Sequence, residues 1–100
     1  MASITCTTTK HVTLTTTTAD TVTCAPDTAI TPFKVEILNR DPAVVLYYRL
    51  DGTTAVSAAD GTYAVLPGQS VITHQSAGHI ISIVGNGNAY SVHRLPAGTV

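Results

Sequence analysis

Charged residues are scarce in this sequence. Asp, Glu, Lys and Arg make up 11% of its 100 residues, and the formal net charge is −1 at pH 7, whereas soluble domains ordinarily carry about 25% charged residues. The basic residues are spread along the chain, at Lys10, Lys34, Arg40, Arg49 and Arg94. Because phosphate backbones are bound by clustered Lys and Arg, the sequence argues against a nucleic-acid partner. So few charges also protect a surface only weakly against association.

Aromatic residues and long apolar runs are few as well. There is no Trp, and 5% of the residues are aromatic, fewer than stacking platforms for bases or sugars ordinarily use. No apolar run approaches the ~20 residues that span a bilayer. The first residues, MASITCTTTK, lack the basic and apolar regions of a secretory signal. We therefore expect no membrane partner and a chain that stays in a cytoplasm until lysis.

Cysteine occurs only at Cys6 and Cys24. Two cysteines on neighbouring strands can be bridged where their Cα atoms approach within about 7 Å. In a reducing compartment, however, thiols persist, so we expect both residues to be reduced. No His or third Cys stands at zinc-finger spacing from them, which argues against a zinc site.

The residue patterns of catalysis and of metal binding are also missing. No two histidines stand at metal-ligand spacing on one strand; they are His11, His74, His79 and His93. Three aspartates have the carboxylates that calcium prefers, namely Asp41, Asp51 and Asp60. Each precedes Gly or Pro, and the geometry of a turn is enough to explain an aspartate at such a position. Gly85–Asn86–Gly87 precedes no helix that would bind phosphate, and no Gly-x-Ser-x-Gly elbow occurs. The sequence predicts no enzyme, no cofactor and no metal.

Short β-branched runs separated by turn signals fill the chain from residue 11 onward. The runs cover 33–38, 44–50, 62–66, 71–74, 80–84 and 89–95, and the last two predict a hairpin around residues 85–88. In the Thr-rich start, Val12, Leu14 and Val22 alternate with polar residues, with a turn expected at Ala19–Asp20. The pattern predicts an all-β fold without substantial helix. The expected architecture is a compact sandwich of about seven to eight short antiparallel strands, Ig-like or jelly-roll-like.

The Thr-rich residues 1–10 are predicted to be an N-terminal arm or a first strand that adds little to the core. Residues 11–100 are predicted to be a single β-sandwich domain. In the run 44–50, alternate residues from Val44 to Leu50 line one face, and the opposite face is still largely apolar. From that second face and the N-terminal segment we predict the interface residues, Ile4, Thr5, Val45, Tyr47 and Arg49.

The order of the motifs has a counterpart in a known group of proteins. The segments are HVTLTTTTADTVTC, KVEILNRD, VVLYYRLDGTTA, ADGTYAVLPG and HIISIVGNGNAYSVHRL. Together they resemble small β-sandwich proteins encoded among the virion structural genes of actinobacterial tailed bacteriophages. The matching pieces are Tyr48 to Gly52, Asp60 to Gly68, Ile81 to Gly85 and Tyr90 to Val92.

This resemblance implies a non-enzymatic virion protein, a minor capsid or decoration protein on the outside of the head shell. The expected partner is the major capsid protein, and a homo-oligomer is expected, with a trimer favoured over a dimer. The chain would lie on the capsid exterior in the virion and in the host cytoplasm during assembly. Two alternatives stay open, namely a head-tail connector, tail or fibre module, and a soluble carbohydrate or adhesion-type binding domain.

Overall fold

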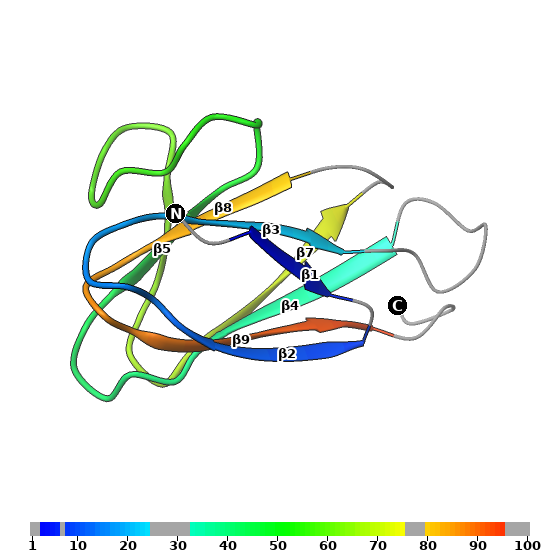
Figure 1. The fold of residues 1–100 in the computed structure, drawn as a ribbon, viewed down its shortest axis with the longest axis horizontal. Coiled ribbons are helices and arrows are strands. Elements are labelled where there is room, and N and C mark those ends of the chain that lie inside the picture. The colour runs from blue at the N-terminus through cyan, green and yellow to red at the C-terminus, as the bar shows by residue number, and fades with distance from the viewer. Residues whose placement is uncertain (1–2, 7, 25–32, 76–79, 96–100) are drawn as a thin grey trace.

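The computed structural model describes residues 3–6, 8–24, 33–75 and 80–95, and these residues contain strands but no helix. They form two sheets packed face to face, with β3 and β8 above β2 and β9 in the view of Figure 1. The strands are β1 (Ser3–Cys6), β2 (Thr9–Thr13), β3 (Asp20–Cys24), β4 (Phe33–Asn39), β5 (Leu46–Arg49), β6 (Tyr63–Val65), β7 (Ser70–Gln75), β8 (Ile80–Val84) and β9 (Ala89–Arg94). The predicted all-β sandwich is therefore confirmed.

The strands pair in a nested order. The sheet orders are β1-β3-β8-β5-β6 and β2-β9-β4-β7. The outermost antiparallel pair in sequence is β2 with β9, and inside it lie β3 with β8, β4 with β7 and β5 with β6. The chain from β2 to β9 is thus one long antiparallel ribbon wrapped into two sheets, which is the jelly-roll arrangement. β1 stands outside this order and pairs with β3 in parallel.

The predicted hairpin between β8 and β9 is wrong. β8 lies between β3 and β5 in one sheet, and β9 lies between β2 and β4 in the other. The Gly85–Asn88 segment therefore crosses from sheet to sheet. A Gly-Asn-Gly-Asn sequence indicates a change of direction, but it does not say whether the flanking strands pair with each other. Both strands are central ones, which explains why they bury so many of their residues.

The turn expected at Ala19–Asp20 is also misplaced. The Thr18 N–H donates to the Thr15 carbonyl over 3.0 Å, and Thr16 has the positive φ of 47° that this turn requires. Asp20 is instead the first residue of β3 and is buried. It is retained there because the Tyr90 hydroxyl donates to its carboxylate over 2.7 Å. Burial and then this contact with Asp20 raise the pKa of Tyr90.

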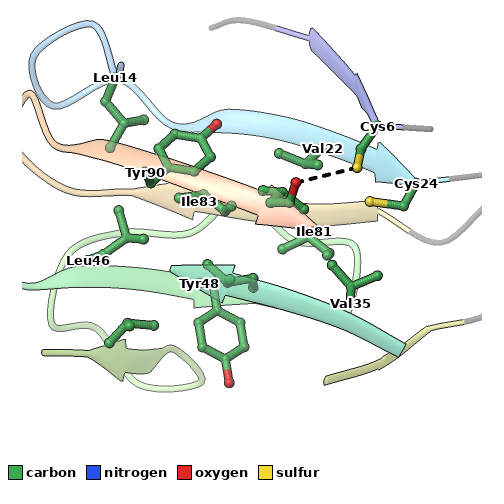
Figure 2. Packing of buried hydrophobic residues seen from close by; sticks show 13 residues of the cluster. Cys6, Leu14, Val22, Cys24, Val35, Leu46, Tyr48, Ile81, Ile83 and Tyr90 are labelled. Carbon is green, nitrogen blue, oxygen red and sulfur yellow. Dashed lines mark hydrogen bonds between the residues drawn. The ribbon is translucent and has the colours of Figure 1, made fainter. Parts of the chain in front are cut away.

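The core lies between the sheets and follows the alternation that the sequence predicted. Val35 and Ile37 of β4 and Leu46 and Tyr48 of β5 are buried, while the residues between them are partly exposed. They form one cluster with Ile81, Ile83 and Tyr90 of the central strands, and Figure 2 labels most of these side chains. Burying each large aliphatic side chain contributes about 1.5–3 kcal/mol.

Residues 1–10 add more to this core than we expected. Cys6 is fully buried, and Ile4 packs against the same cluster. Both point inward because they alternate on β1 with Ser3 and Thr5. Of the two alternatives, an arm or a first strand, the described part of this segment is β1 and the start of β2.

Two buried amides hold one end of the sandwich together. The Asn88 side-chain amide donates to the Asn39 side-chain oxygen over 3.2 Å and to the Val44 carbonyl over 2.9 Å. The Asn39 amide donates in turn to the carbonyls of Val44 and Val65. Three loops meet at this pair, and the close approach of the Asn88 side chain leaves no room for a Cβ at Gly85. Neither of these buried amides was predicted from the sequence.

Candidate interaction surface

Over β5 and β8, the outer face of the five-stranded sheet is covered by the chain itself. The segment 50–62 between β5 and β6 folds over it, drawn in green in Figure 1. Its Ala55 N–H donates to the Ser82 hydroxyl over 2.8 Å, and both residues are buried. Ala55 also packs with Ala19 and Val84, against which the Tyr47 ring lies. We call this part of the outer face, over β5 and β8, the covered face.

Arg49 fastens the same segment. Its Nε and Nη2 atoms donate to the two carboxylate oxygens of Asp51 over 2.9 and 2.7 Å, and Nη1 donates to the Asp60 carbonyl over 3.2 Å. The guanidinium lies directly against Gly61, where an added Cβ would meet it at 2.9 Å. The Arg49 hydrogen bonds, with the Thr53 N–H, hold the pKa of Asp51 well below its usual range.

These contacts place the predicted interface residues. Tyr47 and Arg49 are turned toward the segment 50–62 of their own chain, and Val45 is half-buried beside β5. On β1, Ile4 packs against the core while Thr5 is exposed. Three of the five therefore have intramolecular partners. Their role in an interface stays a prediction.

The outer face of the four-stranded sheet, which we call the open face, carries polar pairs. The His11 Nδ1 atom lies 2.6 Å from the Ser91 hydroxyl, and the His93 Nδ1 atom lies 3.9 Å from Glu36. Each of these pairs joins neighbouring strands in register. No group of three or more potential metal ligands occurs among the described residues. His74 is on β7, and His79 lies outside the described residues.

The aspartates considered for calcium have turn roles where the structure describes their contacts. The Asp41 carboxylate accepts from the N–H groups of Ala43 and Val44 over 2.8 and 2.9 Å. The Asp51 carboxylate accepts from Arg49 and from the Thr53 N–H. Such side-chain to backbone bonds are what short polar residues ordinarily make in turns.

The segment 63–75 combines exposed apolar side chains with a sheet edge. Tyr63, Leu66 and Ile72 are each 58% exposed, although all three are large hydrophobic residues. β6 and β7 are the last strands of their respective sheets, so each presents one row of backbone N–H and C=O groups that is not used within its sheet. We call this segment, with its three exposed side chains, the apolar edge.

β7 lacks the features that usually protect an edge strand. Its sequence, SVITHQ, contains no Pro, Lys, Arg, Asp or Glu, and it is six residues long. Natural edge strands ordinarily carry charges, prolines or bulges that prevent pairing with another chain. An edge without them can bind an extended segment of a partner by adding a strand. The apolar edge is therefore the described surface best suited to protein association.

Tyr63 is positioned by a second ring. It stands opposite Tyr48 in the β5–β6 pair, and the two rings stack with their centroids 5.3 Å apart and their planes at 27°. Offset stacking of this kind contributes about 0.5–1.5 kcal/mol. The exposed Tyr63 ring is thus held in a defined orientation, which lowers the entropic cost of using it in an interface.

The apolar edge was not predicted from the sequence, although one signal for it was available. Val71 and Ile72 are adjacent apolar residues in a strand, and neighbouring residues of a strand face opposite sides. Val71 packs against the core, so Ile72 faces outward. The exposure of Tyr63 and Leu66 follows from the position of β6 at a sheet edge, which is a property of strand order.

Comparison with known proteins gives no match to a family model, to a curated protein or to a solved structure. Within the described residues there is also no helix with the length and hydropathy to cross a membrane.

Proposed function

We propose that this chain is a non-enzymatic structural protein of a phage virion, a minor capsid or decoration protein that binds the outside of the head shell. The observation that carries the proposal is the apolar edge, an unprotected edge strand flanked by Tyr63, Leu66 and Ile72. The major capsid protein is the proposed partner, and the exterior of the capsid is the proposed location.

Three further observations support this proposal. The order of motifs resembles phage virion proteins, and jelly-roll sandwiches occur among viral capsid domains. The low charge of the chain favours association over solvation. A β-sandwich whose loops are tied by buried hydrogen bonds provides a rigid body for a protein that must be repeated on a lattice.

Attachment to a shell does not require each copy to bind tightly. An oligomer that contacts a repeated lattice at several sites gains avidity because the second contact is intramolecular. A trimer would match threefold local symmetry on a shell, and we propose it ahead of a dimer. Analytical ultracentrifugation of the purified chain distinguishes the two states.

Co-sedimentation with head shells tests the proposal. Shells purified from a phage strain that lacks this gene are mixed with the purified chain and pelleted. We expect the wild-type chain to pellet with the shells and the double variant Tyr63→Ser/Ile72→Glu to remain in the supernatant. The matched control is Val56→Ser, which removes another exposed hydrophobic residue, 59% exposed, outside the apolar edge.

The possible outcomes distinguish an error in the proposed docking surface from an error in the proposed function. If the double variant is folded and pellets as fully as the wild type, the apolar edge is not the docking surface. If the wild type does not bind shells either, the decoration role is wrong. Deleting residues 2–9 would be a poorer test, because it removes the buried Cys6 together with the rest of β1.

A carbohydrate-binding role is the second candidate, and one observation favours it. The Tyr63 ring is exposed and held by Tyr48, as a sugar-stacking ring must be. A glycan array separates this role from the first, because a sugar-binding domain retains glycans in the absence of shells. Loss of glycan binding on Tyr63→Ser alone, with shell binding absent throughout, would favour this candidate.

A further inference from the structure

The two cysteines are brought together by strand pairing. β1 runs parallel to β3, and the register places Cys6 directly opposite Cys24. Paired strands lie about 4.8 Å apart, and disulfides span Cα separations of about 4.4–6.8 Å. Both side chains point into the core, and Figure 2 shows their sulfur atoms, in yellow, side by side at one end of the packed cluster.

The two thiols also interact chemically. The hydrogen bond from the Cys24 thiol holds the pKa of Cys6 below its usual range. Burial alone would raise this pKa, whereas the backbone N–H and the positive charge of Arg94 lower it further. The same contact, together with burial, raises the pKa of Cys24. The Cys6 thiol itself points toward the Val92 carbonyl, 3.6 Å away. The pKa of Cys6 is therefore the lower of the two, and the register keeps Cys24 directly opposite it.

We propose that Cys6 and Cys24 form an intramolecular disulfide when the chain meets a disulfide oxidant, and that this bond fastens β1 to β3. The proposal does not depend on what the chain binds. It is compatible with two thiols in a reducing cytoplasm, because the bond would form only where the surroundings become oxidising.

The reaction balances with glutathione disulfide as the oxidant. The Cys6 thiolate attacks one glutathione sulfur, forming a mixed disulfide and releasing the first glutathione. Cys24 then loses its proton and attacks the Cys6 sulfur, which releases the second glutathione. Two thiols are oxidised to one disulfide, one glutathione disulfide is reduced, and the two protons pass to the two glutathione thiolates.

Access to the buried sulfurs comes from the edge position of β1. β1 is the first strand of its sheet and pairs only with β3, through four residues. Short edge strands open locally at far lower cost than the whole domain. Opening of β1 exposes Cys6 to the oxidant, and its return places Cys6 opposite Cys24, where the bond closes. Once closed, the bond opposes further opening of β1.

An equilibrium measurement tests the proposal and does not require the oxidant to reach the buried sulfurs of the folded chain. The chain is refolded from urea into buffers of graded reduced and oxidised glutathione, then alkylated under denaturing conditions and weighed by mass spectrometry. The same buffers with urea retained give the reference for the unfolded chain. A native structure that holds the sulfurs together should favour the bridge about 100-fold more than the unfolded chain does.

A matched variant tests the register. In Thr5→Cys/Cys6→Thr the composition is unchanged, but the thiol moves to the other face of β1 and away from Cys24. We expect the preference for the bridge in the folded over the unfolded chain to fall to one or below, since adjacent residues of a strand point to opposite faces. The Cys24→Ser variant, which has no partner thiol, gives the baseline for mixed disulfides with glutathione.

A second readout measures the effect on β1. In the wild type, the bridge should raise Tm by ~10 °C and slow amide hydrogen exchange at Ile4 and Thr5. The proposal is overturned if folding does not favour the bridge over the unfolded chain, if the bond forms between two copies, or if the bridged chain exchanges its β1 amides as fast as the reduced one.

Discussion

The outer faces of the two sheets follow the same strand pattern but have different environments. On the covered face, Ser82 and Val84 point away from the core and are nevertheless buried, because the segment 50–62 folds over them. On the open face, Ile72 and Ser70 of the edge strand β7 also point outward, and they are exposed. The difference teaches that an outward position in a strand does not by itself mean a solvent-exposed or partner-binding residue.

The same contrast explains why residues predicted to form an interface are in contact with their own chain. The apolar second face of the run 44–50 was interpreted as a docking surface, and Tyr47 from that face packs against Ala55 of the same chain. A thirteen-residue connection between two paired strands has enough length to satisfy that face internally. Three of the five exposed large hydrophobic side chains among the described residues, those of Tyr63, Leu66 and Ile72, occur instead on the apolar edge, beside strands that end their sheets.

A charge placed under the covering segment should have the largest effect. Val84→Asp buries a carboxylate among the apolar side chains of Ala19, Ala55 and Tyr47. We expect a loss of about 3 kcal/mol in the free energy of unfolding, or failure to fold. Urea denaturation measures it. Ile72→Asp on the open face is the control, with an expected loss of stability under ~1 kcal/mol. Equal losses for the two variants would mean that water reaches the covered face.

Removing a hydroxyl from each face sharpens the comparison. Ser82→Ala leaves the buried Ala55 N–H without its acceptor, so we expect a loss of about 2 kcal/mol. Ser70→Ala removes a hydroxyl whose partner, Glu36, is 3.3 Å away and accessible to water, and should change stability by less than ~0.5 kcal/mol. Chemical denaturation of the two variants side by side gives both numbers. A cost at Ser82 no greater than at Ser70 would contradict the buried contact.

The fit of Arg49 against the covering segment predicts a difference between two glycines. Gly52 and Gly61 have nearly the same φ, +83° and +86°, but an added Cβ meets nothing at Gly52 and meets the Arg49 guanidinium at Gly61. Gly52→Ala should cost about 1 kcal/mol from backbone strain alone. Gly61→Ala should cost more, because Arg49 must also move. Thermal unfolding measures both variants, and identical Tm values would show that Arg49 is not held against Gly61.

The ion pair on the covered face should give the smallest effect, visible only in acid. Because the folded pKa of Asp51 lies below its usual value, its contribution is fully present above about pH 4. That contribution is lost as the pH falls through the lowered folded-state value. Asp51→Asn should therefore reduce stability slightly at neutral pH and make it less sensitive to acid. Urea midpoints between neutral pH and pH 2 test this, and a parallel fall for both proteins would argue against the pair.

Local patterns were predicted well. Leu46 and Tyr48 were placed on one face of the run 44–50 from alternation alone, and both are buried. Val35 and Ile37 in the predicted run 33–38 are buried in the same alternating way. The turn after residue 84 was correctly located, yet its flanking strands lie in different sheets. The turn in the Thr-rich start was misplaced by a few residues because several threonines are equally suited to it. The apolar edge was missed because edge position depends on strand order.

The sequence by itself determined the class of the fold and the inward face of most strands. Side-chain direction alternates with every residue, so a local pattern of Val, Ile and Leu suffices to specify it. Tertiary structure alone decided which strands pair, which face is covered and which two sulfurs meet. Val12 pairs with Tyr90 and Cys6 with Cys24, and such partners are selected by the packing of the complete core, because no local segment contains both residues.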